Sequence, residues 1–202
     1  MPRWTAVPLA IALGGGVYAC GEVTPDPNNP LAQFTAAAEQ MQKAAEGFTS
    51  NRKPVPPVAF RELIEFLPTK VSGMKAADPK GETTTAGSWQ YSQAEANFRS
   101  EDGARRLEVG IFDYAHIPFL YIPFNMVLNM NVSRESTEGY EKSVKVEGYP
   151  ALEKWSKNGS SEIVVLVGDR FIVKADAHGL GEGSARKVVE DMDLDDLASK
   201  GK

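Results

Sequence analysis

The strongest constraint on the fold is a pair of β-branched runs near the C-terminal end of the chain. Residues 163–167 are apolar at every position, residues 170–174 form a second run, and Gly168-Asp169 lies between them. A Gly-Asp pair between two such runs is typical of a β-hairpin with a two-residue turn. Because a strand that is apolar at every position is covered on both faces, we expect residues 163–167 to be a central strand.

A second hairpin is predicted in residues 88–114. Alternating apolar residues on both sides of a turn at 100–103 indicate two strands. The alternation changes phase between Tyr91 and Ala94, which suggests a β-bulge. The segment 76–87, which contains glycine, threonine and proline, is predicted to be a loop.

The other predicted elements are two strands and two amphipathic helices. The strands are expected at residues 144–146 and 151–155, and the helices at residues 60–67 and 184–197. Ser184 is the predicted N-cap of the last helix, and Asn158-Gly159 is a typical hairpin turn. The fold class predicted from these elements is α+β, a largely antiparallel sheet of about six strands with helices packed on it.

The first twenty residues have the features of an export signal. Arg3 is followed by an uncharged stretch and then by Val17-Tyr18-Ala19-Cys20, which resembles the bacterial lipobox. The resemblance implies cleavage before Cys20, a thioether-linked diacylglyceryl group on its sulfur and an acyl chain on the new N-terminus. Several acyl chains together make membrane attachment stable. The alternative is an ordinary signal peptide that leaves a free thiol on Cys20. If the protein is a lipoprotein of a Gram-negative cell, Gly21 in place of aspartate implies the outer membrane.

Behind the predicted signal peptide at 1–19, the sequence divides into two parts. Residues 20–56 comprise the lipidated cysteine, a proline-punctuated tether, an amphipathic helix at 31–48 and a proline-rich linker. The helix either docks on its own domain or serves as a stalk, or it pairs with a partner helix. Residues 57–202 are predicted to be the globular domain.

Composition excludes several classes of function. The net charge is −5 and no block of lysine and arginine is present, which argues against nucleic-acid binding. A single cysteine excludes an intrachain disulfide and a multi-thiolate metal site. The acidic run 190–196 lacks the glycine and the terminal glutamate of a calcium loop, so a solvated helix face is expected and no cofactor or metal is predicted.

The segment 117–130 is the candidate binding surface. Two prolines interrupt its apolar run, which argues against a regular strand or helix at that point. The segment either plugs one end of the domain or lines a contact with a partner or an apolar ligand. The candidate binding residues are Phe119, Tyr121, Phe124, Met126 and Met130.

Residues 60–198 resemble an uncharacterised bacterial lipoprotein family. The matching motifs are Phe60-Arg61-Glu62-Leu63 with Leu67-Pro68, Asp102-Gly103, Val109-Gly110-Ile111-Phe112-Asp113, Gly139-Tyr140-Glu141-Lys142 and Val165-Leu166-Val167-Gly168-Asp169-Arg170-Phe171. The family implies a membrane-anchored protein but brings no activity to transfer. The order of the elements is also similar to the Mog1/PsbP-like fold, an analogy of shape alone.

Three functions are consistent with these features. The favoured hypothesis is an exported, lipid-anchored module without catalytic activity, which contacts an envelope protein or a small apolar ligand. A surface-tethered hydrolase is the first alternative, and its acid and base residues would come from Asp113, His116 and His178. A structural spacer of the cell envelope is the second alternative, and it predicts neither a pocket nor an exposed apolar patch.

Overall fold

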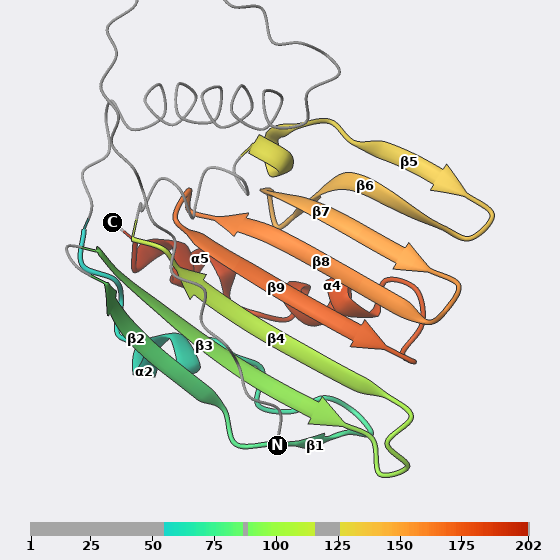
Figure 1. Cartoon of the computed structure of the whole chain (residues 1–202), viewed down its shortest axis with the longest axis horizontal. Coiled ribbons are helices and arrows are strands. Elements are labelled where there is room, and N and C mark those ends of the chain that lie inside the picture. The colour runs from blue at the N-terminus through green and yellow to red at the C-terminus, as the bar shows by residue number, and fades with distance from the viewer. Residues whose placement is uncertain (1–54, 87–88, 116–125, 202) are drawn as a thin grey trace, which may run out of the picture. The chain divides into compact units, whose positions relative to one another are not determined.

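The computed structural model describes residues 55–86, 89–115 and 126–201. The chain divides into two compact units, Met1–Met41 and Gln42–Lys202, and the described residues all belong to the second. Nine strands in these residues form one antiparallel sheet, in the order β1-β3-β4-β9-β8-β7-β6-β5, with β2 also paired to β3 (Figure 1). No helix in the described residues is long and apolar enough to cross a membrane.

The strands differ in length and in their place in the sheet. Their bounds are β1 Lys75–Ala76, β2 Lys80–Ala86, β3 Trp89–Arg99, β4 Arg106–Asp113, β5 Ser133–Ser136, β6 Gly139–Val146, β7 Tyr149–Ser156, β8 Ser160–Val167 and β9 Phe171–His178.

Three short helices cover one face of the sheet. They are α2 Phe60–Ile64, α4 Ser184–Glu190 and α5 Leu194–Ser199. Helix α2 contacts β2 and β3, whereas α4 and α5 contact β8 and α4 also reaches β9 (Figure 1). The main core lies between these helices and the sheet, and Leu63, Leu194 and Leu197 are fully buried in it. The opposite side of the sheet is called the open face below.

The predicted central hairpin is confirmed, with one change in its turn. Strand β8 lies between β7 and β9, and Val167 pairs with Phe171, so the turn holds Gly168, Asp169 and Arg170 instead of two residues. Gly168 and Asp169 both have positive φ, and a Cβ on Gly168 would lie 3.1 Å from Ala198. Arg170 lies in the turn, and its side chain donates a hydrogen bond to Asp113.

The predicted fold class is wrong: the domain is not a balanced α+β fold with about six strands. It is mostly sheet, with nine strands and short helices. The three strands that were not predicted, β1, β2 and β5, all lie at the two edges of the sheet. All residues of β1 and β5 are exposed, so hydrophobic alternation does not mark them. The segment 76–87 was predicted to be a loop from its glycine, threonine and proline, and this prediction is wrong, because the segment contains β2.

The prediction of a bulge in β3 is also wrong. The register with β4 runs without interruption from Ser92 to Arg99. Tyr91 belongs to the open face, whereas Ala94 is buried against the helices, so residues on both faces of one regular strand produced the apparent change of phase.

The predicted C-terminal helix is two helices. Helix α4 begins at Ser184 after Gly183, which has a left-handed conformation, so Gly183 occupies the N-cap position instead of Ser184. Asp193 starts α5 by accepting a hydrogen bond from the backbone N–H of Asp196. The aspartate is an N-cap, and this local bond divides the acidic run into two helices.

Candidate functional site

The segment that begins at residue 126 is anchored on the open face. A helical turn at 126–129 buries Leu128 in a second apolar cluster with Leu152, Leu166 and Ile172. Ser143 on β6 holds the end of this segment, because its Oγ donates to the Met130 carbonyl at 2.7 Å. The same Oγ accepts from the backbone N–H of residue 132 at 2.9 Å. The segment is therefore part of the folded domain and covers one part of the open face.

Three apolar side chains of this segment point to solvent. Met126, Val127 and Met130, called the methionine patch below, are 43%, 41% and 56% exposed. Leu128, between them, is 4% exposed. The described part of the candidate segment thus does two things: Leu128 fills the cluster beneath, and its neighbours form an apolar surface.

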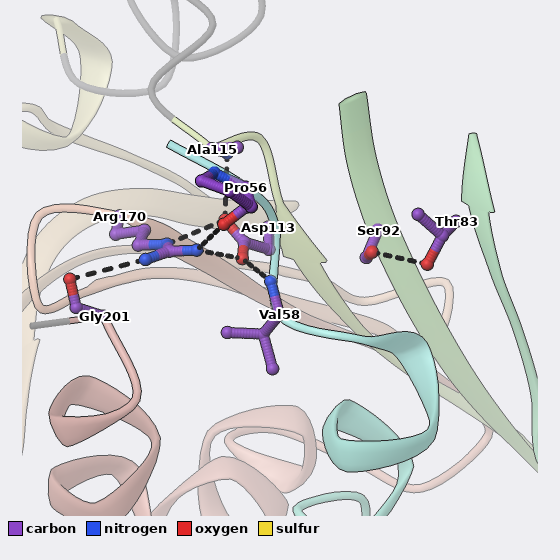
Figure 2. A network of polar contacts seen from close by, with 8 residues as sticks. All are labelled: Pro56, Val58, Thr83, Ser92, Asp113, Ala115, Arg170 and Gly201. Carbon is purple, nitrogen blue, oxygen red and sulfur yellow. Dashed lines mark hydrogen bonds and ion pairs between the residues drawn. The ribbon is translucent and has the colours of Figure 1, made fainter. Parts of the chain in front are cut away.

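Among the described residues, the most buried charged pair is Asp113 with Arg170. The carboxylate of Asp113 is fully buried, and Arg170 Nη2 donates to its Oδ2 at 2.7 Å while Nε donates to its Oδ1 at 3.0 Å (Figure 2). The backbone N–H groups of Val58 and Ala115 complete the acceptor capacity of the carboxylate, at 2.8 and 2.9 Å. All four donors are structural, so no free oxygen edge remains for chemistry.

Arg170 also ties together distant parts of the chain. Its Nη2 donates to the Pro56 carbonyl at 3.0 Å and its Nη1 to the Gly201 carbonyl at 3.4 Å (Figure 2). One side chain therefore joins the start of the described domain, the β8–β9 turn, the end of β4 and the C-terminal residues. The pair is a structural clamp.

The hydrolase alternative draws its acid and base residues from Asp113, His116 and His178, and the sheet keeps Asp113 and His178 apart. Asp113 pairs with Phe171 at the start of β9, whereas His178 ends that strand seven residues further on. At roughly 3.3 Å a residue, the two lie about 23 Å apart along the strand. They also belong to opposite faces, because Asp113 faces the helices. His116, the third residue of that hypothesis, lies outside the described residues.

A polar hollow of about 770 Å³ lies on the open face at the other end of the sheet. Its border includes Lys75, Arg99, Arg106 and His178, called the basic row below. The ends of β3 and β9 lie near β1 and the start of β4 (Figure 1), and residues of these four strands line the hollow. His178 Nε2 lies 2.9 Å from Asp176 Oδ1, without the alignment of a hydrogen bond.

A third polar cluster lies on the helix-covered face around Glu153. The carboxylate is 4% exposed, and Tyr140 donates to its Oε1 at 3.2 Å, while Lys142 Nζ and Arg186 Nη1 lie 3.8 Å from its Oε2. Burial raises the pKa of Tyr140, and the negative charge of Glu153 raises it further. The cluster links β6, β7 and α4 and has a structural role.

Of the predicted binding residues, only two lie in the described part of the chain, and the sequence did not indicate the basic row. Met126 and Met130 were candidates and are exposed, whereas Cys20, Phe119, Tyr121 and Phe124 lie outside the described residues. The basic row was missed, because its members are scattered between residues 75 and 178 and only the strand register brings them together.

Comparison with protein-family models, with curated proteins and with solved structures finds no match to this chain.

Proposed function

We propose that this chain is an exported bacterial lipoprotein, held at the cell envelope by lipid on Cys20, and that its β-rich domain is a binding module without catalytic activity. The partner is an envelope protein with an apolar contact surface, bound through the methionine patch. Both parts of the proposal extend the expectations drawn from the first twenty residues and from the segment 117–130.

The methionine patch is the observation that carries the binding role. Large apolar side chains scattered singly are ordinary on protein surfaces, but here three exposed ones lie within five residues. Methionine is flexible and polarizable, so it adapts to partners of different shape. The backbone beneath is held by Ser143 and Leu128, so the patch is presented on a fixed support.

The two alternatives are less well supported. Of the residues offered to the hydrolase, Asp113 at the end of β4 and His178 at the end of β9 lie on opposite faces and at opposite ends of the paired strands, so these two cannot share a site. The spacer predicts no exposed apolar patch, whereas Met126, Val127 and Met130 form one.

The anchor is tested on the protein purified from membranes of a producing bacterium. Mass spectrometry of the N-terminal peptide should find Cys20 as the first residue, carrying a diacylglyceryl group and an N-acyl chain. The Cys20→Ser variant should leave the membrane fraction or keep its first nineteen residues. An unmodified thiol in the native protein contradicts the anchor.

The patch is tested by a pair of variants that differ in burial. Met126→Gln with Met130→Gln should leave the unfolding midpoint unchanged and weaken partner capture in envelope extracts, measured by site-specific photocrosslinking from position 127. Leu128→Ala is the matched control, and it should cost about 2–5 kcal/mol of stability because it opens a cavity in the cluster. Crosslinks that are equally strong in the double glutamine variant contradict the proposal. If the parent protein binds a component of lipid extracts and no envelope protein, the ligand is a small apolar molecule instead.

A further inference from the structure

The basic row is continuous across four neighbouring strands. Lys75 of β1 pairs with Arg99 of β3, Arg99 pairs with Arg106 of β4, and Arg106 pairs with His178 of β9. Residues paired in this way point to the same face of the sheet. Strands lie about 4.8 Å apart, so the row extends over roughly 14 Å of the open face.

This arrangement is unfavourable for the fold taken alone. Like charges directly opposite each other destabilise a sheet. In the described residues, neither Arg99 nor Arg106 has a carboxylate within ion-pair distance, and Lys75 has only an exposed contact with Glu101 at 3.2 Å.

Elsewhere on the same face, several charged side chains lie beside an opposite charge on a neighbouring strand, although Glu108, Asp176 and Glu162 form a row of acidic residues across β4, β9 and β8. Arg134 pairs with Glu141 and Lys154 lies beside the same carboxylate, at 3.2 and 3.6 Å. Lys174 lies 3.4 Å from Glu162. In the described residues, Arg99 and Arg106 have no such opposite charge at ion-pair distance, and both border the polar hollow.

We propose that the polar hollow binds a phosphate group of a small molecule or of a lipid headgroup, with Arg99 and Arg106 as its main donors. A guanidinium offers two parallel N–H groups that match two phosphate oxygens, and two such groups on adjacent strands can hold one phosphate from two sides. Lys75 lies at one end of the row, and Lys80 adds a second lysine to the border of the hollow.

The surroundings restrict the class of ligand. A volume of about 770 Å³ falls within the range of small-molecule sites. Glu108 and Asp176 border the hollow in the next row of the sheet and repel an anion that extends beyond the basic row. With a net charge of −5 on the chain, a single phosphate group is favoured over an extended polyanion such as nucleic acid. This site does not depend on the methionine patch or on the lipid anchor.

The test uses the full chain in neutral detergent at fixed ionic strength. Isothermal titration calorimetry is run with inorganic pyrophosphate in one arm and with micelles that contain phosphatidylglycerol in the other. Arg99→Gln and Arg106→Gln should each weaken binding about tenfold or more, since each removes a charge-assisted contact with the phosphate. Arg134→Gln is the matched control, because it removes the same charge from an exposed arginine of the same face and should bind like the parent.

The outcomes separate the sources of the phosphate. Binding of pyrophosphate that the first two variants lose supports a soluble phosphorylated ligand, and binding of phosphatidylglycerol alone supports a lipid headgroup. Failure of both probes to bind the parent overturns the proposal, as does equal weakening by Arg134→Gln. Circular dichroism checks that the variants fold. Arg106→Lys keeps the charge, and it should still weaken binding several-fold if the paired donors matter; unchanged affinity in this variant overturns the role of the guanidinium.

Discussion

Removing the cation from the buried Asp113–Arg170 pair should destabilise the domain more than any surface charge change. Arg170→Met keeps much of the side-chain volume but leaves the Asp113 carboxylate buried with two backbone donors and no counter-charge. It also removes the bonds to the Pro56 and Gly201 carbonyls.

The magnitude follows from the burial of both partners. The Asp113 side chain is 0% exposed and that of Arg170 is 6% exposed, so solvent can screen neither charge. Breaking such a pair from one side costs about 3–5 kcal/mol. Because a domain of this size is stable by about 5–15 kcal/mol, the variant should lose a large part of its stability. Its melting temperature should fall by roughly 6–20 °C.

A double-mutant cycle measures the pair directly. Urea unfolding is followed for Arg170→Met, for Asp113→Asn and for both changes together. Each single change leaves one unpaired buried charge and the double change leaves none, so the double variant should be more stable than the sum predicts by about 1–3 kcal/mol.

The control for this cycle is an exposed pair of the same kind. Lys75 and Glu101 are 76% and 88% exposed at their side chains, and Glu101→Gln should cost less than about 1 kcal/mol. The reasoning is refuted if Arg170→Met costs no more than Glu101→Gln, or if the two changes in the cycle are additive.

Three further predictions concern single contacts. The hydrogen bond to Asp195 and partial burial raise the pKa of Tyr149 to about 12 from 10.0, so this contact stabilises the fold below about pH 10 and is lost as the pH rises to about 12. The stability advantage of the parent over Asp195→Asn, measured by urea unfolding, should vanish across that interval, and an advantage independent of pH contradicts the assignment. Asp193→Ala should cost about 0.5–2 kcal/mol through loss of the α5 cap, whereas Asp191→Ala should cost less, as thermal unfolding would show. Arg99→Gln should raise stability by about 0.2–1 kcal/mol because it relieves cross-strand repulsion, and a loss of stability would indicate a structural role for this arginine.

The central elements could be predicted because burial imposes a pattern on them. The alternation in β4, the continuous apolar run in β8 and the turn residues between β8 and β9 all reflect positions where one or both faces are covered. The edge strands β1 and β5 could not be predicted, since their residues are exposed and the edge position imposes no apolar period.

The candidate surfaces divide in the same way. The methionine patch is contiguous in the chain, so an apolar run interrupted by prolines pointed to its residues. The basic row is not contiguous: its residues lie on four strands, and each looks like an ordinary solvated charge in its own segment.

The sequence by itself determined the central hairpins, the amphipathic segments that cover them and the turns between them, because these depend on local periodicity and backbone preference. Only the tertiary structure decided that Asp113 meets Arg170 across fifty-seven positions and that Arg99, Arg106 and His178 stand side by side. The physical reason is register: a strand pairing shifted by one residue moves every side chain to the other face. Charge clusters and buried ion pairs follow from that register and leave no local pattern in the chain.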